Sequence, residues 1–359
     1  MSNKLPYFYT DKPLFGLDIG HGTLKVMQLE QSKKPHISGY GLAKFDIKAL
    51  DNGAIVDPKA IAIAIRNMFR NDLIGEITTS RVAMTIPAYR TFSRSIRLPK
   101  LSDSELQEAV RLEAEQYIPV PLQELYLDYS PIGDTADGGK EFFIVAVPKK
   151  VVDSYLELAR MLGLEIVLIE STMAACSRFF HEDKNSGMAS VIIDFGSLTA
   201  DISIYDKTIL ATSTVAAGGL VFTDAIRKKL QISQEEAGFI KTKYGLDANV
   251  VVQKQVVAAV EPVLQKLMTE IRRIVRYYEE RYGAKSHIDQ VVMLGGGANM
   301  PGLSNFLTDA LKVPVRTHNH PWSLFDYNEK HKLPAAADRL MFVTVAGLSL
   351  VNPKEVFAQ

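Results

Sequence analysis

Two short segments of the chain repeat one pattern: an apolar run that ends in an aspartate, a glycine-rich turn, and a second apolar run. The first segment is Leu14–Val26, which contains Asp18, and the second is Val191–Ile204, which contains Asp194. In both segments apolar residues alternate again after the turn, which predicts a β-hairpin. The copies lie 176 positions apart, so they predict two related halves rather than a short-period repeat array.

A third glycine turn follows a strand pattern nearer the C-terminus. Gln290–Leu294 is an apolar run of strand length, Gly295, Gly296 and Gly297 follow it, and a helix is expected over Leu303–Leu311. Each turn alone is as typical of an Asx-stabilised loop as of a ligand site. Three such turns facing one another from two lobes predict a nucleotide in the cleft. The sequence contains neither a P-loop nor a G-x-G-x-x-G dinucleotide fingerprint.

The aspartates that precede the two hairpin turns suit a phosphate and metal site. Backbone N–H groups in such turns point into a concavity, where they and the hydroxyls of Thr23, Ser197 and Thr199 can hold phosphate oxygens. Mg²⁺ is commonly held by carboxylates, water and substrate phosphates together. The sequence therefore predicts phosphates between the hairpins and Mg²⁺ beside Asp18 and Asp194.

Composition excludes several other classes of function. The 359 residues carry 41 Lys+Arg and 41 Asp+Glu, so no net charge attracts nucleic acid or anionic lipid. The single cysteine, Cys176, excludes a disulfide framework and multi-cysteine metal sites, and we expect it to be buried as a small apolar residue. The seven histidines show no metal-ligand spacing. The length favours two lobes over a single core.

Nothing in the sequence predicts direct contact with a membrane. We expect no signal peptide and no spanning helix, because the longest apolar runs are of strand length. The final segment, Leu348–Gln359, is too short and too poor in cations for a membrane-binding amphipathic helix. We therefore expect a cytoplasmic protein without a direct membrane anchor, which a partner recruits to the inner face of the membrane.

Residues 88–165 predict a compact α+β insertion in the first half of the chain. Ser102 and Glu105 form a capping box, after which apolar residues recur at helical spacing. Two alternating runs, 126–129 and 141–147, predict a pair of strands.

The second half predicts a helical subdomain over residues 223–285. Its longest helix is expected over Val256–Tyr282, with apolar residues at steps of three and four. Several arginines lie near the end of this helix. We expect them on a solvated face, paired with Glu279 and Glu280.

These segments resemble known families. The hairpins and the third glycine turn resemble the two phosphate motifs and the adenosine motif of the actin, Hsp70 and sugar-kinase superfamily, over nearly the whole chain. Ser104–Val110, Glu113–Leu122 and Leu127–Tyr129 resemble the insertion of the PilM family, the FtsA-like proteins of type IV pilus assembly. The string EAEQYIPVPL carries most of this second resemblance, because it is far more specific than the glycine turns.

The resemblance implies an α/β fold of the actin-like ATPase type, with two RNase H-like lobes and an FtsA-type inserted α+β subdomain in the first lobe. Residues 1–190 would form the first lobe, including the insertion over residues 88–165. Residues 191–325 would form the second lobe, including the helical subdomain over residues 223–285. The segment 326–359 would return to the first lobe.

The resemblance also implies ATP and Mg²⁺ as cofactors in the cleft. Matched by position, Asp18 and Asp194 would lie at the metal. The nucleotide-binding residues that it implies are Gly20, His21, Gly22, Thr23, Lys25, Gly196, Ser197, Thr199, Gly218, Gly219, Lys241, Gly295, Gly296, Gly297 and Ala298.

Three positions depart from the family pattern. His21 stands where a small serine or threonine is common, which changes the geometry of the phosphate contact. Ser171 stands where the bacterial actin MreB has the glutamate that positions the attacking water, so hydrolysis is expected to be slow unless Glu170 reaches that water. Gly238 replaces a glutamate that usually touches the ribose, which predicts a lower nucleotide affinity. We therefore expect at most a slow ATPase, with Glu170 as its candidate catalytic residue.

The implied partner is PilN, an inner-membrane protein whose short cytoplasmic N-terminal peptide would bind a groove near the inserted subdomain. Tyr117, Ile118, Pro119 and Leu122 are the candidate contact residues, although the same string is also typical of a plain helix stop. The resemblance further implies a place in the pilus inner-membrane complex, and it leaves self-association open.

Two functions from different classes remain. A nucleotide-gated scaffold would close on ATP and so shape a docking surface for a pilus-assembly protein, with little turnover. The alternative is an enzyme: an ATPase or filament-forming protein like FtsA or MreB or, less favoured, a small-molecule kinase. A kinase needs a carboxylate base in line with the phosphate, and its one candidate, Asp201, lies inside a predicted strand. We favour the scaffold.

Overall fold

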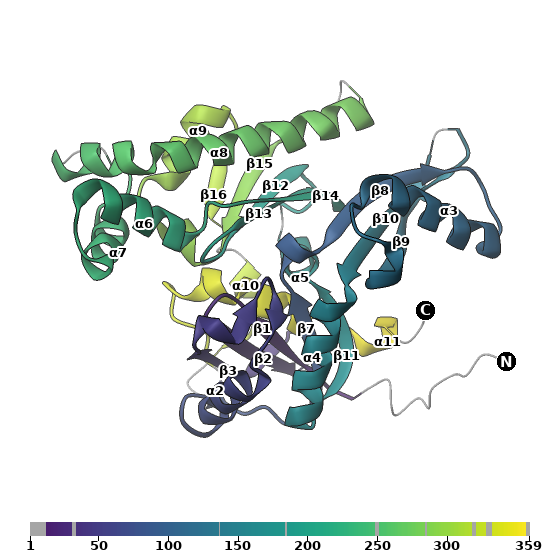
Figure 1. The fold of residues 1–359 in the computed structure, drawn as a ribbon, viewed down its shortest axis with the longest axis horizontal. Helices are drawn as coiled ribbons and strands as arrows, with labels where there is room; N and C mark the ends of the chain where they lie inside the picture. The colour runs from purple at the N-terminus through teal and green to yellow at the C-terminus, as the bar shows by residue number, and fades with distance from the viewer. Residues whose placement is uncertain are drawn as a thin grey trace.

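Two lobes and a smaller inserted body beside them make up the protein in this computed structural model (Figure 1). The structure describes residues 12–30, 34–135, 137–183, 185–247, 251–283, 286–317, 321–327 and 332–356. Residues 1–11 and 357–359, which the sequence analysis assigned to the first lobe and to the C-terminal segment, lie outside the described residues.

The first lobe is built on a six-stranded sheet. Its strands are β1 (Phe15–Ile19), β2 (Thr23–Glu30), β3 (His36–Lys44), β6 (Ile74–Gly75), β7 (Arg81–Ile86) and β11 (Glu165–Ser171). They are ordered β11-β7-β1-β2-β3-β6. β1 pairs antiparallel with β2 and parallel with β7. The first hairpin predicted from the sequence is therefore confirmed, and it lies at the centre of the sheet.

Helices cover both faces of this sheet, and they are α2 (Pro58–Asn71), α4 (Lys149–Leu162), α5 (Thr172–His181) and α10 (Val343–Ser349). Successive side chains of a strand point to opposite faces, so β1 contacts both layers. Leu17 packs with α2 and α4 in one apolar core. Gly16 lies against α10, where a Cβ on it would lie 2.8 Å from Leu348 Cβ. The hairpin is thus held between two helical layers.

The second sheet has eight strands and extends beyond the second lobe. Its order is β16-β15-β12-β13-β14-β8-β10-β9. The second-lobe strands are β12 (Ser190–Phe195), β13 (Ala200–Asp206), β14 (Thr208–Val215), β15 (Gln290–Leu294) and β16 (Val315–Thr317). The inserted strands are β8 (Phe92–Leu98), β9 (Leu125–Asp134) and β10 (Lys140–Pro148). β12 and β13 pair antiparallel, which confirms the second predicted hairpin.

The inserted subdomain is shorter than the 88–165 predicted from the sequence. It consists of β8, α3 (Asp103–Tyr117), β9 and β10, and the capping box at Ser102 and Glu105 is present as predicted. Helix α4 lies outside it, because Val151, Tyr155 and Leu158 are buried in the core of the first lobe. The subdomain therefore ends near Pro148.

The helices of the second lobe are α6 (Gly219–Leu230), α7 (Gln234–Lys243), α8 (Val251–Tyr282) and α9 (Leu303–Leu311), and the C-terminal end of α8 extends toward the inserted strands (Figure 1). The predicted apolar stripe of α8 is buried in the core of this lobe. The predicted partners of its arginines are wrong. Arg273 pairs with Glu270, and Arg281 reaches across to Glu141 on β10.

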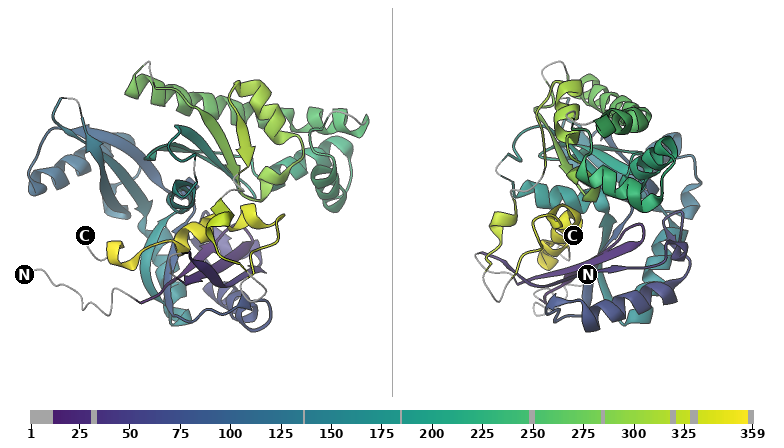
Figure 2. Two further views of the ribbon diagram at one scale, coloured as in Figure 1. Left: turned by 180° about the vertical axis from the view of Figure 1, so that it is seen from behind. Right: turned by 90° about the vertical axis from the view of Figure 1, so that its left-hand side faces the viewer.

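The two lobes meet at a core that includes α5 and α10. Cys176 is buried there, as predicted, and Trp322 packs against Phe179 with ring centroids 5.2 Å apart. Figure 2 shows the C-terminal helices, in yellow, running along the first lobe. Among the described residues no helix combines the length and apolar character needed to cross a bilayer.

Short elements complete the described chain: β4 (Leu50–Asp51), β5 (Ala54–Ile55), η1 (Ile47–Ala49), η2 (Ala88–Arg90), η3 (Leu122–Glu124), η4 (Gly296–Asn299), η5 (Pro321–Leu324), η6 (Arg339–Phe342) and α11 (Pro353–Val356).

Gly347 should be needed for the packing of α10 on α5. A Cβ at this position would lie 1.9 Å from the carbonyl oxygen of Ala175, so one helix must move. Gly347→Ala should lower the free energy of unfolding by about 1–3 kcal/mol, the usual cost of overpacking a core. An unconstrained helical glycine would instead gain stability on this change.

Urea unfolding of both variants and the wild type checks this prediction, with Gly187→Ala as the matched control. No atom lies within 4 Å of a Cβ at Gly187, so its effect should stay within about 0.5 kcal/mol. Equal stability of the two variants would contradict the packing account.

Candidate functional site

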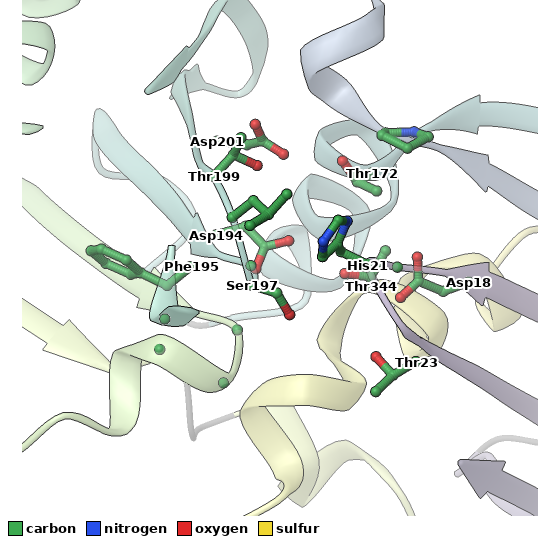
Figure 3. A pocket seen from close by; sticks show the side chains of 18 of the residues that line it. Asp18, His21, Thr23, Thr172, Asp194, Phe195, Ser197, Thr199, Asp201 and Thr344 are labelled. Atoms are coloured by element: carbon green, nitrogen blue, oxygen red, sulfur yellow. The ribbon is translucent and has the colours of Figure 1, made fainter. Parts of the chain in front are cut away.

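The turns of the two hairpins face each other across a cleft of about 540 Å³ between the lobes (Figure 3). Asp18 and His21 reach the cleft from the first lobe, and Asp194 and Ser197 reach it from the second. The third glycine turn, at Gly295, joins the wall from the second lobe. The three turns that the sequence singled out therefore lie around one space.

In the first hairpin Asp18 is a fully bonded carboxylate. It lies directly opposite Lys25 in the register of β1 and β2, and the Lys25 Nζ donates to its Oδ2 at 2.9 Å. The hydroxyl of Thr85 donates to Oδ1 at 2.7 Å. The turn itself is closed by the Gly20 N–H, which donates to the Thr23 carbonyl at 2.8 Å. Lys25 is thus the countercharge of Asp18 at the floor of the cleft.

The second hairpin is tied to the beginning of helix α6. The Gly219 N–H donates to the Gly196 carbonyl at 2.9 Å, and the Leu220 N–H donates to the Ser197 carbonyl at 2.7 Å. Lys241 of α7 donates to the Gly219 carbonyl at 2.9 Å. The N-terminal end of α6 therefore lies beside this loop, and its partial positive charge favours an anion there.

The third turn requires glycine because it passes directly over the second hairpin. Gly295 has φ +81°, and a Cβ on it would lie 2.3 Å from Oδ1 of Asp194. A Cβ on Gly297 would lie 2.8 Å from that of Phe195. This close approach brings backbone rather than side chains to the wall beside Asp194.

The second-lobe carboxylates, half-buried Asp194 and buried Asp201, form no ion pair with a cation among the described residues. Burial, followed by the charges of Asp201 and Asp18, raises the pKa of Asp194 to about 7, and Lys25 lowers it by less. Burial likewise raises the pKa of Asp201 to about 6, although its Oδ1 accepts a hydrogen bond from Thr214. Burial also lowers the pKa of His21, so its imidazole is neutral near pH 7. The cleft has a deficit of positive charge beside Asp194.

Mg²⁺ together with a nucleotide fits these residues. The described part of the chain contains no group of three acidic, histidine or cysteine side chains that could bind a metal by itself. Mg²⁺ usually takes one or two carboxylates and completes its shell with water and phosphate oxygens. Asp18 and Asp194 offer that number of carboxylates, and the turn amides offer donors to phosphates.

Most residues predicted for the nucleotide do line the cleft: Asp18, Gly20, His21, Thr23, Lys25, Asp194, Gly196, Ser197, Thr199, Gly219, Lys241, Gly295, Gly296 and Gly297. Three others belong to the same turns but lie behind the wall. Gly22 supplies a turn with φ +83°, Gly218 caps α6, and Ala298 is buried under the third turn.

Glu170 is not placed to act on a ligand in the cleft. Its carboxylate accepts two hydrogen bonds from Arg178, at 2.5 and 2.7 Å, and it does not line the cleft. Ser171, beside it, caps helix α5 by accepting from the Ala174 N–H. The prediction of Glu170 as the catalytic residue is therefore corrected: its charge is neutralised by a neighbouring arginine.

The sequence did not reveal several residues that line the cleft from other elements. Thr172, Thr344, Tyr89 and Asn52 all contribute side chains to its wall. Thr172 begins a helix directly after a strand, which was the one available signal. The others come from loops and from the C-terminal helix, and only the tertiary fold brings them here.

The candidate partner residues divide into two kinds. Ile118 and Leu122 are buried in the core of the inserted subdomain, so the prediction that they line a groove is wrong. Pro119 is exposed and Tyr117 is half-buried. The Tyr117 ring lies under the Arg94 guanidinium, 5.3 Å from it, and burial raises the pKa of its hydroxyl to about 12.

Two lobes of mixed sheets and helices that hold acidic glycine hairpins over one cleft define an actin-like protein with an FtsA-type insertion. The family model for type IV pilus assembly protein PilM matches residues 16–352. The chain therefore belongs to the PilM family of type IV pilus assembly proteins.

Comparison with curated proteins finds cell division proteins FtsA. The FtsA of Bacillus subtilis is 25% identical over 344 residues, which span 84% of this chain and 77% of that protein. The FtsA of Neisseria meningitidis is 24% identical over 347 residues, spanning 84% and 82%. These relatives agree with the FtsA-like character expected from the sequence.

Among solved structures, the PilM-PilN type IV pilus biogenesis complex matches with a TM-score of 0.80 at 24% identity, covering 95% of this chain and 98% of that one. MreB 5 of Spiroplasma citri bound to AMPPNP matches with a TM-score of 0.53 at 13% identity, covering 94% of each chain. At these identities the matches establish the fold, which is the actin-like ATPase fold expected from the sequence.

Replacing Asp194 by asparagine should stabilise the protein above neutral pH. The pKa of this carboxyl in the folded protein, about 7, exceeds the ordinary aspartate value of 3.8. The folded state therefore binds more protons than the unfolded state between these values, and its stability falls as pH rises through them. Asp194→Asn removes that penalty and should gain roughly 2–4 kcal/mol at pH 8, but little near pH 4.

Urea unfolding at pH 4, 6 and 8 measures the difference, with Asp309→Asn on the exposed face of α9 as the control. Asp309→Asn removes an exposed carboxylate remote from the cleft, so it controls for the loss of one acidic side chain. A variant at position 194 that shows no pH-dependent gain over the wild type would contradict the buried-charge account.

Proposed function

We propose that this protein is a nucleotide-gated docking scaffold of type IV pilus assembly. ATP with Mg²⁺ binds in the interlobe cleft, and the occupied protein docks the N-terminal cytoplasmic peptide of an inner-membrane partner of the PilN type. The observation that carries the proposal is the pair of facing hairpins, in which half-buried Asp194 forms no ion pair with a described cation and the hydroxyls of both turns line the same cleft.

The phosphate end of the cleft is the part best supplied with donors. The hydroxyls of Thr23, Ser197 and Thr199 line this space. The N-terminal end of α6 adds a favourable field for an anion. Asp18 and Asp194 would hold Mg²⁺, which would supply neutralisation of the phosphate charge.

The nucleoside end is formed by the third turn and by α7. Gly295, Gly296 and Gly297 bring backbone close to the space, and Lys241 lies opposite them. Burial lowers the pKa of Lys241, whose ammonium donates to a backbone carbonyl. Gly238 is not among the residues that line the cleft, and a glycine has no side chain that could reach a ribose.

Little turnover is expected from these residues. An in-line water attack gains from a positioned carboxylate base. Glu170 is engaged by Arg178, and Asp201 of β13 accepts a hydrogen bond from Thr214 of the neighbouring strand β14. Asp194 and Asp18 are assigned to the metal. The arrangement therefore supports a protein that holds ATP as a structural ligand.

Docking of a PilN-type peptide is supported by family membership and by the fold match to a protein named as part of a PilM-PilN complex. Tyr117 and Pro119 are the predicted contact residues that reach the surface of the inserted subdomain. Recruitment by such a partner would place this protein at the inner face of the membrane, within the pilus inner-membrane complex.

The alternative function is an ATPase or filament-forming protein like FtsA or MreB. It is favoured by the sequence relation to FtsA and by the fold match to MreB. It requires a carboxylate base in line with the phosphate. Glu170 does not line the cleft, and Asp201, which does, is hydrogen-bonded to Thr214, so we rank it second. A small-molecule kinase ranks lower for the same reason.

Calorimetric titration with a synthetic N-terminal peptide of the PilN from the same organism tests the proposal. Bound Mg·ATP should tighten peptide binding by about 5- to 150-fold, the usual range of allosteric coupling. Asp18→Ala and Asp194→Ala should remove this gain and leave the peptide affinity of the nucleotide-free protein. ATP turnover measured in parallel should stay slow.

Asp309→Ala is the matched control, because it removes an exposed aspartate remote from the cleft, and it should keep the full gain. If the peptide does not bind, and if ATP turnover is rapid and is abolished by Asp18→Ala and Asp194→Ala, the scaffold proposal is wrong and the ATPase proposal takes its place.

A further inference from the structure

The inserted subdomain is part of the second-lobe sheet, although the chain enters and leaves it from the first lobe. β8 pairs antiparallel with β14, with Arg94 opposite Ala211. The hydroxyls of Ser93 and Thr212 are hydrogen-bonded across the same edge. Figures 1 and 2 both show the inserted strands continuing the sheet of the second lobe. One continuous sheet thus joins two bodies that the sequence assigns to different lobes.

A buried glutamate fastens the subdomain to the longest helix of the second lobe. Glu141 of β10 is 6% exposed, and its Oε1 accepts hydrogen bonds from the Arg281 Nε at 3.0 Å and Nη2 at 2.9 Å. The Tyr282 hydroxyl donates to the same oxygen at 2.9 Å, and the Arg97 Nε lies 3.6 Å away. A buried charge loses much if its partners separate, so this contact resists opening.

Further contacts lie along the same junction. The Arg97 Nη2 donates to the carbonyl of Arg281 at 3.1 Å. The Ser95 hydroxyl lies 3.4 Å from the hydroxyls of Tyr277 and Tyr282, both on α8. Ile132 of β9 packs against the apolar core of the second lobe. The attachment therefore combines backbone, ionic and apolar contacts.

The contacts that the subdomain makes with the first lobe are more exposed. The Tyr126 hydroxyl donates to Asp153 at 3.0 Å in an exposed hydrogen bond, and Lys149 lies over the same ring. Phe143 packs, half-buried, on the core where the lobes meet. Exposed polar contacts of this kind contribute little to stability.

The connector between β7 and β8 lies on the nucleotide cleft. It is the short helix η2, and the side chains of Pro87 and Tyr89 line the cleft. The N–H of Ala88 donates to the hydroxyl of Thr172, which lines the cleft as well. Hinges are commonly a few residues at the ends of elements. A hinge here would sense the occupant of the cleft directly.

From these contacts we infer that the inserted subdomain moves with the second lobe, and that η2 and the β10–α4 junction at Pro148 are its hinges to the first lobe. The inference rests on the proposed function, in which Mg·ATP draws the lobes together. Closure then carries the subdomain across the first lobe and reshapes a surface that both of them form. Nucleotide binding in the cleft is thereby coupled to a partner-docking surface outside it.

Distances between spin-label pairs test the inference. Cysteines placed at exposed positions report on the three bodies: Lys59→Cys in the first lobe, Glu108→Cys in the subdomain and Lys266→Cys in the second lobe. The native Cys176 is fully buried, which limits its labelling. On Mg·ATP the 59–108 distance should shift by several ångström while the 108–266 distance stays constant. A constant 59–108 distance with a shifted 108–266 distance would overturn the inference.

Removing the buried charge should loosen the coupling. Glu141→Gln keeps the shape of the side chain but loses the ion pair with Arg281, so the 108–266 distribution should broaden. Glu124→Gln, which removes an exposed carboxylate of the same subdomain, is the matched control and should leave the distribution unchanged. An unchanged distribution in Glu141→Gln would count against the role of the Glu141–Arg281 contact in holding the subdomain to α8.

A separate readout distinguishes failure of the proposed function from failure of this inference. If calorimetry shows no nucleotide binding, the proposed function fails. The ligand-free protein still decides the inference, because the 108–266 distribution should be narrower than the 59–108 distribution when no ligand is present. The reverse order of widths would overturn it.

Discussion

The buried charge of Asp194 is the constraint around which the cleft is organised. Asp18, its counterpart in the first lobe, is neutralised by Lys25 and accepts a hydrogen bond from Thr85. Asp194 has no such partners in the described part of the chain, and burial together with the charge of Asp201 raises its pKa. Burying an uncompensated carboxylate is costly, so the ligand-free protein holds a site that a cation would relieve. The third glycine turn can lie against this carboxylate because Gly295 has no side chain: a Cβ there would lie 2.3 Å from Oδ1 of Asp194.

The residues around the cleft are better suited to binding a nucleotide than to hydrolysing it. Hydroxyls and carboxylates line the cleft, while Glu170, the candidate base expected from the sequence, lies outside it and is bonded to Arg178. A protein of this design can use the free energy of nucleotide binding without hydrolysing the nucleotide. The binding free energy can then shift the equilibrium position of the lobes and of the inserted subdomain, whose strands continue the sheet of the second lobe.

The sequence could predict the parts of the site that form within one short segment, but not the contacts between residues far apart in the chain. The hairpins were predictable because aspartate, glycines and alternating apolar residues lie within about a dozen positions of each other. The ion pair of Asp18 with Lys25 follows from the hairpin register, and only the structure revealed it. The contact between Glu141 and Arg281 could not be predicted, because these residues are 140 positions apart and β8 joins an edge strand of another lobe. Ile118 was misjudged because the end of an amphipathic helix turns its apolar residues inward.

Hydrogen–deuterium exchange with and without Mg²⁺ and a non-hydrolysable ATP analogue tests the central claim most directly, namely that both hairpins bind one nucleotide across the cleft. The account predicts that residues 18–25 and residues 194–201 gain protection together, at the same analogue concentration, and that the hinge at residues 87–91 changes with them. Protection confined to one hairpin, or absent from both at saturating analogue, would contradict it.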